Sequence, residues 1–245
     1  MLFDGPNCDL FDAVRPIKWV DPEVDGNDKY DILVIGGGAG GLVTAAGSKG
    51  LGARVCLIER AFLGGDCLNT GCVPSKAFLK SCNVAHNART AAEYGVHIDG
   101  EIRIDFPAIM TRMKKIRAEI SENDSAQRFS TNMGVDLYLG HAKFTGSNTV
   151  EINGKTISFL KACIATGGRP NIPDIEGIQD IKYYTSDNIF NLVSLPKRML
   201  VVGSGPIGCE LGQGFARLGS QVTMMSSGSS FLRNEDADCS VYLME

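Results

Sequence analysis

The fold is decided by the stretch Ile32-Leu33-Val34-Ile35-Gly36-Gly37-Gly38-Ala39-Gly40-Gly41, an apolar run that ends in a glycine loop of the form G-x-G-x-x-G. The run is typical of a buried parallel strand, and a helix is expected to follow the loop. In such a loop the first glycine allows the tight turn, the second lets a pyrophosphate approach, and the third lets helix and strand pack closely. The stretch predicts a dinucleotide-binding βαβ unit over residues 30–60. Glu59 lies at the end of its second strand, where an acid can bond a ribose.

The same arrangement occurs a second time, 167 residues later and without a gap. This copy begins Met199-Leu200-Val201-Val202-Gly203-Ser204-Gly205-Pro206-Ile207-Gly208. A lone loop of this kind could be a turn that binds nothing, but each copy here has a strand before it and a helix and second strand after it. The position equivalent to Glu59 is Ser226. The second loop therefore lacks the acid that favours NAD, and Ser226, Ser227 and Arg233 would be compatible with NADP.

Two cysteines follow the first unit, in Gly64-Gly65-Asp66-Cys67-Leu68-Asn69-Thr70-Gly71-Cys72-Val73-Pro74-Ser75-Lys76. The glycine turn is expected to bring the chain back beneath the first nucleotide site. Cys72 is expected at the start of a helix that continues to about Arg89, where the helix dipole lowers the pKa of a thiol. A redox pair is the favoured interpretation. A zinc half-site, a structural disulfide and two incidental buried thiols are the alternatives, and neither His86 nor His97 fits a zinc-ligand pattern.

The bulk composition is that of a globular protein and excludes several classes. The chain has 245 residues, a net charge of −4, 44% hydrophobic and 21% charged residues, which gives no reason to expect nucleic-acid binding. No apolar stretch is long enough for a membrane span. The eight cysteines do not resemble a secreted disulfide scaffold, so a reducing, cytoplasmic location is expected, with an organelle left open. Residues 1–28 are interpreted as an extension, loosely ordered at its start, because the segment is too acidic for a signal or transit peptide.

The remaining pattern predicts an α/β fold with Rossmann-like parallel sheets and an inserted antiparallel β-meander. Ile104 to about Met133 has the period of one long amphipathic helix. Short strands are expected at 135–139, 149–152 and 156–160, and Asn153-Gly154 is a strong hairpin signal. Residues 161–165 are expected to return to the parallel sheet. The predicted division is a first dinucleotide-binding domain over 29–170 and a second over 171–245, both of them incomplete.

Together these motifs resemble the pyridine nucleotide-disulfide oxidoreductases, the flavoprotein family of lipoamide dehydrogenase, glutathione reductase and mercuric reductase. The resemblance covers about residues 30–245. The Gly64-Gly65-Asp66-Cys67 form is most similar to the mercuric-reductase-like branch, since the other two enzymes usually have threonine in place of Asp66. It implies an oxidoreductase that passes electrons from NAD(P)H through FAD to Cys67–Cys72, and then to a disulfide or metal substrate.

The resemblance also implies roles for single residues. Cys72 would lie against the flavin and Cys67 would exchange with substrate. Lys76 would lie near the flavin and pair with Glu210. The residues implied in binding FAD are Gly36, Gly38, Gly41, Glu59, Gly65, Asp66, Lys76, His141, Ala142, Thr166 and Gly167. Those implied in binding the nicotinamide dinucleotide are Gly203, Gly205, Gly208 and Ser226.

The chain departs from the family pattern at its C-terminal end. The remainder of the second nucleotide domain and the dimerisation domain, with its His-Glu pair, are expected beyond Glu245, and the full-length protein is expected to be a homodimer. An alternative is therefore a truncated flavin-binding chain without turnover, and another is a zinc or thiol-switch protein. Disulfide, lipoamide, quinone and Hg(II) all stay open as substrates.

Overall fold

The computed structural model describes residues 5–23, 29–228 and 231–244, and the chain divides into two compact units. The first comprises Met1–Pro74 and Lys114–Asn188, and the second comprises Ser75–Met113 and Ile189–Glu245. This division differs from a single boundary near residue 170, because residues 75–113 belong with the C-terminal part. The two predicted cofactor-binding domains stay a prediction.

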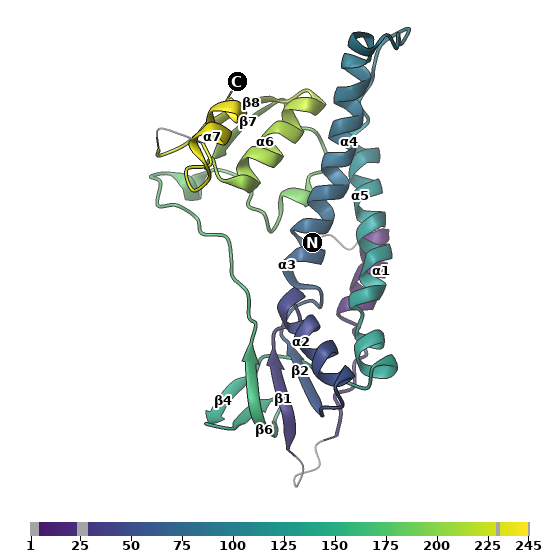
Figure 1. Ribbon diagram of the computed structural model, residues 1–245, viewed down its shortest axis with the longest axis vertical. Helices are drawn as coiled ribbons and strands as arrows, with labels where there is room; N and C mark the ends of the chain where they lie inside the picture. The colour runs from purple at the N-terminus through teal and green to yellow at the C-terminus, as the bar shows by residue number, and fades with distance from the viewer. Residues whose placement is uncertain (1–4, 24–28, 229–230, 245) are drawn as a thin grey trace. The chain divides into compact units, whose positions relative to one another are not determined.

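A six-stranded sheet with the order β3-β2-β1-β6-β5-β4 organises the first unit (Figure 1). The strands are β1 (Tyr30–Ile35), β2 (Val55–Glu59), β3 (Asp136–Leu139), β4 (Lys143–Gly146), β5 (Thr149–Ile152) and β6 (Lys155–Ile164). Strand β1 pairs in parallel with β2 and β6, and β2 pairs in parallel with β3, whereas β4, β5 and the start of β6 are antiparallel. The helix α2 (Ala39–Gly50) connects β1 to β2. The predicted α/β fold with an inserted antiparallel meander is confirmed.

Strand β6 joins the meander to the parallel sheet. Its first residues, Lys155 to Ser158, pair with β5, and Phe159 to Ile164 pair with β1. The two short segments expected at 156–160 and 161–165 are thus one strand, because the same backbone finds a different neighbour along each half. The predicted hairpin turn is confirmed, since Asn153 and Gly154 both have positive φ values, 49° and 76°, as a type I′ turn requires.

The segment interpreted as an extension contributes a helix, α1 (Pro6–Val14), to the core of the first unit. Leu10 and Val14 are fully buried there with Val34, Leu42 and Leu57. The sequence did carry a signal for this helix, because Asn7, Leu10, Phe11 and Val14 have helical spacing, but the acidic residues between them obscured it. The expected loose order at the very start falls on residues 1–4, outside the described residues.

The long helix predicted for 104–133 is interrupted. The helix α5 spans Phe106–Ser121 and is followed by a 3₁₀ turn at Glu122–Asp124 and a π-helical turn at Arg128–Asn132. The break occurs at Ser125, which is extended (φ −72°, ψ 151°) and accepts a hydrogen bond from the Arg128 N–H at 3.1 Å. Ser125 therefore caps a new turn, which the apolar period does not reveal.

The second unit contains the repeated nucleotide motif. It includes most of α4 (Cys72–Thr90), then β7 (Arg198–Val202), α6 (Pro206–Leu218), β8 (Gln221–Met225) and α7 (Ala237–Met244). Strands β7 and β8 pair in parallel with Met199 opposite Val222, which is the register of Ile32 opposite Val55 moved by 167 residues. The helix α6 packs on α4, where the Phe78 and Phe215 rings lie 4.9 Å apart. Within the described residues, no helix combines the length and apolarity that crossing a membrane requires.

Candidate functional site

The first glycine loop leaves no space for side chains where the backbone turns. Gly36 has a φ of 108°, and a Cβ there would lie 2.2 Å from the Ala165 carbonyl oxygen. A Cβ on Gly41 would lie 1.7 Å from the Gly36 carbonyl oxygen, and Gly38 is the N-cap of α2. Gly36 thus permits the turn and Gly41 permits close packing of helix on strand, as expected, whereas the approach of a phosphate to the helix N-terminus at Gly38 stays a prediction.

Glu59 closes the loop from the end of β2. Its side chain is buried, and its two carboxylate oxygens accept hydrogen bonds from the N–H groups of Gly37 and Ala61, each at 2.5 Å. A carboxylate can accept about four hydrogen bonds, so these two leave capacity for further donors such as ribose hydroxyls. The structure thus gives Glu59 a scaffold role that the sequence did not predict, beside the predicted ribose role.

A cavity of about 380 Å³ lies at the carboxyl ends of β1, β2 and β6. This size is within the range of small-molecule sites, and the carboxyl edge of a parallel sheet is where such folds bind ligands. Six predicted residues line it: Gly36, Glu59, His141, Ala142, Thr166 and Gly167. Six further residues complete the lining: Ile35, Ile58, Arg60, Gly140, Gly168 and Arg169. Arg60 and Gly140 were not predicted as site residues, but each directly follows a strand, and this position in the sequence could have identified them.

The segment Gly64–Lys76, which carries both Cys67 and Cys72 and is here named the dithiol segment, is hydrogen-bonded to the first glycine loop. The Gly64 N–H donates to the Gly37 carbonyl at 2.8 Å, and Gly64 forms a parallel bridge with Gly38. A Cβ on Gly65, whose φ is 53°, would lie 2.6 Å from the Cα of Gly38. The predicted return of the chain beneath the first glycine loop is confirmed, and the contact requires glycine at position 65, whereas a Cβ on Gly38 would lie 3.6 Å from the Gly65 Cα.

The two thiols of this segment are brought together. The short helix α3 (Gly65–Asn69) carries Cys67, with Asp66 exposed beside it, and α4 begins at Cys72, as predicted. A hydrogen bond with the Cys72 side chain is the main reason that the pKa of Cys67 rises to about 11, and burial and the Asp124 carboxylate raise it further. Both residues are thiols. Among the described residues no group of three or more His, Cys, Asp or Glu side chains is arranged to hold a metal ion.

The second glycine loop repeats the geometry of the first. Gly203 has a φ of 115°, Gly205 is the N-cap of α6, and a Cβ on Gly208 would lie 2.5 Å from the Gly203 carbonyl oxygen. The Ser204 hydroxyl donates to the Ser226 hydroxyl at 2.8 Å. This contact occupies the place of the bond between Gly37 and Glu59 in the first copy, so Ser226 holds its loop without a negative charge.

Lys76 and Glu210 are the two predicted site residues that the structure does not bring together. Both side chains are exposed, and the described residues include no ion pair between them. Their pairing stays a prediction.

The family model described as pyridine nucleotide-disulphide oxidoreductase matches residues 30–245. A mercuric reductase of Lysinibacillus sphaericus is 38% identical over 214 residues, which are 87% of this chain and 39% of that protein. A dihydrolipoyl dehydrogenase of Acholeplasma laidlawii is 34% identical over 217 residues, 87% of this chain and 64% of that protein.

A flavoprotein disulfide reductase is also found among the similar solved structures. The Cu(II) complex of the HOCl-induced flavoprotein disulfide reductase RclA from Escherichia coli superposes with a TM-score of 0.74 at 27% identity, covering 87% of this chain and 46% of that one. The chain thus spans between 39% and 64% of the length of these relatives.

Proposed function

The chain belongs to the pyridine nucleotide-disulphide oxidoreductases, and from that premise we propose that it carries the flavin site and the redox dithiol of an NAD(P)H-dependent disulfide reductase. Members of this family use FAD and NAD(P)H. Relatives are named as mercuric reductase and dihydrolipoyl dehydrogenase. The proposed acceptor is accordingly a disulfide or a thiol-reactive metal ion such as Hg(II).

One observation carries the proposal: a thiol pair is hydrogen-bonded together on a segment that is itself bonded to a dinucleotide loop. Cys67 and Cys72 make the pair, and the bond from Gly64 to Gly37 joins the segment to the loop. A zinc site would need further ligands near the sulfurs. Two incidental buried thiols would not be expected at a helix start beside a nucleotide site.

The residues that line the cavity fit the adenosine half of FAD. Glu59 would bind the ribose, the start of α2 would face the pyrophosphate, and His141 and Ala142 would flank the adenine. When bound, FAD would supply the two-electron chemistry that links the nicotinamide dinucleotide to the disulfide. The protein would hold the reacting sulfurs next to that cofactor.

The thiol chemistry balances as a two-electron exchange. A substrate disulfide takes two electrons and two protons from Cys67 and Cys72, and two substrate thiols and one Cys67–Cys72 disulfide result. Because the pKa of Cys67 is about 11, this thiol is protonated near neutral pH and must lose its proton before it can attack. We propose that the base comes from outside the present chain, as the family resemblance implies, and that the whole protein is a homodimer in a reducing compartment such as the cytoplasm.

The second glycine loop is proposed to bind the nicotinamide dinucleotide. Ser226 replaces the acid that would repel a 2′-phosphate, so NADPH is compatible with this loop as well as NADH. The rates at which the same preparation oxidises NADPH and NADH decide which of the two dinucleotides it uses.

The proposal is tested by purifying the chain with FAD and following its absorbance during titration with NAD(P)H. We expect bound flavin, two new thiols per flavin, and the long-wavelength absorbance of a thiolate in contact with a flavin. The variant Cys72→Ser should lose that absorbance, and Cys239→Ser, an exposed cysteine on α7, should keep it. Flavin binding without any reduction by NAD(P)H would instead support a binding chain without turnover, and stoichiometric zinc without flavin would contradict the proposal.

A further inference from the structure

We propose that Arg117 is a positioning residue that ties the dithiol segment to the N-terminal helix through Asn7. This inference rests on the proposed redox function of Cys67 and Cys72. It concerns residues 5–23, here named the N-terminal strap, for which the family resemblance, beginning near residue 30, assigns no role.

Arg117 lies in α5 and is 1% exposed. One guanidinium nitrogen, Nη1, donates to the Asn69 carbonyl oxygen at 2.7 Å. The other, Nη2, donates to Asn7 Oδ1 at 2.6 Å. The guanidinium is planar and presents its donors in a fixed fork, so it sets the relative position of the two acceptors rather than merely attracting them. A buried arginine thus bridges α1 to the end of α3.

Asn69 passes this constraint to the thiols. It lies between Cys67 and Cys72, and its Nδ2 donates to the carbonyl oxygens of Leu63 at 3.0 Å and Gly65 at 2.8 Å. These bonds close α3 onto the glycine turn that contacts the nucleotide loop. The Asn69 Oδ1 atom is buried and has no hydrogen-bond partner among the described residues. The Asn69 side chain is therefore held by the two bonds that its Nδ2 donates, and the Asn69 backbone carbonyl is held by Arg117.

The strap also contacts the two residues that precede Gly64, and it contacts the backbone at the end of β2. The Leu63 N–H donates to the Val14 carbonyl at 3.2 Å, and the Phe11 and Phe62 rings meet edge to face at 5.1 Å. Arg15 Nη1 donates to the Glu59 carbonyl oxygen at 3.1 Å. The same short helix therefore bears on both parts of the proposed site.

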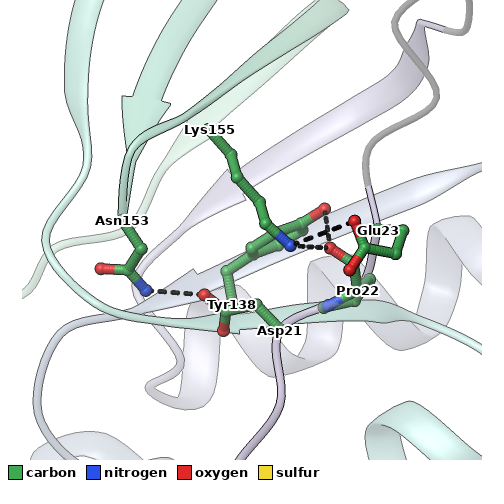
Figure 2. Close-up of polar contacts among 6 residues, drawn as sticks. All are labelled: Asp21, Pro22, Glu23, Tyr138, Asn153 and Lys155. Atoms are coloured by element: carbon green, nitrogen blue, oxygen red, sulfur yellow. Dashed lines mark hydrogen bonds and ion pairs between the residues drawn. The ribbon is translucent and has the colours of Figure 1, made fainter.

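The far end of the strap is anchored on the meander, as Figure 2 shows. Asn153 Nδ2 donates to Asp21 Oδ2 at 2.7 Å, and Lys155 Nζ donates to the Pro22 carbonyl oxygen at 2.8 Å and lies 3.8 Å from Glu23 Oε2. The Tyr138 hydroxyl donates to the same Pro22 oxygen at 3.3 Å. Among the described residues, no contact joins this end of the strap to the dithiol segment. A substitution at this end is therefore a matched control.

Loss of the Asn7 acceptor should loosen α3 and weaken the hydrogen bond between Cys67 and Cys72. The pKa of Cys67 should then fall from about 11 toward its ordinary value of 9.0, because that bond is the main cause of the shift. The disulfide should also form less readily, since the two sulfurs are held together for less of the time.

The test uses the 245-residue chain in glutathione redox buffers, with the Cys67–Cys72 disulfide measured by mass spectrometry and Cys67 alkylation measured against pH. In this exchange oxidised glutathione takes two electrons and two protons from the dithiol. We expect Asn7→Leu to lower the equilibrium constant for disulfide formation about tenfold, equivalent to a potential higher by about 30 mV. The alkylation midpoint should fall by about one pH unit, whereas Asn7→Asp, which keeps an oxygen acceptor, and Lys155→Met should both resemble the unmodified chain.

An equilibrium constant for Asn7→Leu within twofold of the unmodified chain would overturn the inference, and so would an equal shift in Lys155→Met. If Asn7→Leu does not fold, as judged by Trp19 fluorescence, Arg117→Lys supplies the comparison, because its single nitrogen replaces two donors in a fixed fork. Failure of the unmodified chain to form a Cys67–Cys72 disulfide would instead overturn the proposed function itself, and this inference with it.

Discussion

Replacing Glu59 by glutamine tests whether the carboxylate at the end of β2 holds the first glycine loop in place. In the native chain its two oxygens each accept a backbone N–H at 2.5 Å, from Gly37 and Ala61. An amide has one oxygen and one NH₂ group, so it can accept from only one of them and presents a donor to the other.

The expected cost follows from these two contacts. Losing a hydrogen bond to a charged group costs about 1.5–3 kcal/mol, and a buried N–H group is left facing another donor. The neutral amide is easier to bury than a carboxylate, which offsets part of this loss. We therefore expect Glu59→Gln to lower the free energy of unfolding by about 2 kcal/mol.

The assay is urea unfolding followed by fluorescence of Trp19. This is the single tryptophan of the chain, and its indole N–H donates to the Leu137 carbonyl oxygen at 3.1 Å in the unit that contains Glu59. With a slope of about 2 kcal/mol per molar urea, the midpoint should fall by about 1 M. Glu151→Gln, at an exposed glutamate of β5, is the matched control and should change the free energy of unfolding by less than about 0.5 kcal/mol.

A midpoint for Glu59→Gln that coincides with that of Glu151→Gln would refute this reasoning. The two short contacts would then not hold the loop, and Glu59 would be left with the ligand role alone.

Three further outcomes are expected. Gly41→Ala should abolish flavin retention and lower the urea midpoint, because its Cβ would lie 1.7 Å from a loop carbonyl oxygen, whereas Gly40→Ala, with 3.9 Å of space, should retain flavin. In the reduced chain the rate of Cys67 alkylation should rise with a midpoint near pH 11, since Cys72 and burial raise the pKa of Cys67. The free energy of unfolding should fall as the pH rises from about 9 to 11, because the thiol of the unfolded chain ionises first. An alkylation midpoint near pH 9 would contradict the contact between the two thiols. Gly214→Val should lower the free energy of unfolding of the second unit by about 1–3 kcal/mol, because a Cβ at this position would lie 3.0–3.3 Å from three side chains of α4. Circular dichroism in urea measures the change, and an unchanged urea midpoint would mean that α6 and α4 separate easily.

Much of the nucleotide architecture could be read from local sequence. The two G-x-G-x-x-G loops predicted the strands and helices of both copies, and the constant offset between them agrees with the shared strand register that the structure shows. Asn153-Gly154 predicted the hairpin. These features depend on residues next to one another in the chain, since positive φ angles and apolar periods are local properties.

Other features depended on partners far away in the sequence. Strand β6 reads as two segments but is one, because its halves pair with different strands. The break after α5 follows from a cap at Ser125 that an apolar period does not show. Arg117 looks like a solvated residue in a charged helix, yet it is buried.

The sequence alone therefore determined the fold class, the two glycine loops and the position of the two neighbouring cysteines, since each is encoded by a few neighbouring residues. Only the tertiary structure decided that the N-terminal residues belong to the core, that Glu59 holds its own loop, and that Arg117 joins Asn7 to the dithiol segment. The bond between Arg117 and Asn7 alone links residues 110 positions apart, and hydrogen-bond geometry at that separation is set by packing, which no local pattern records.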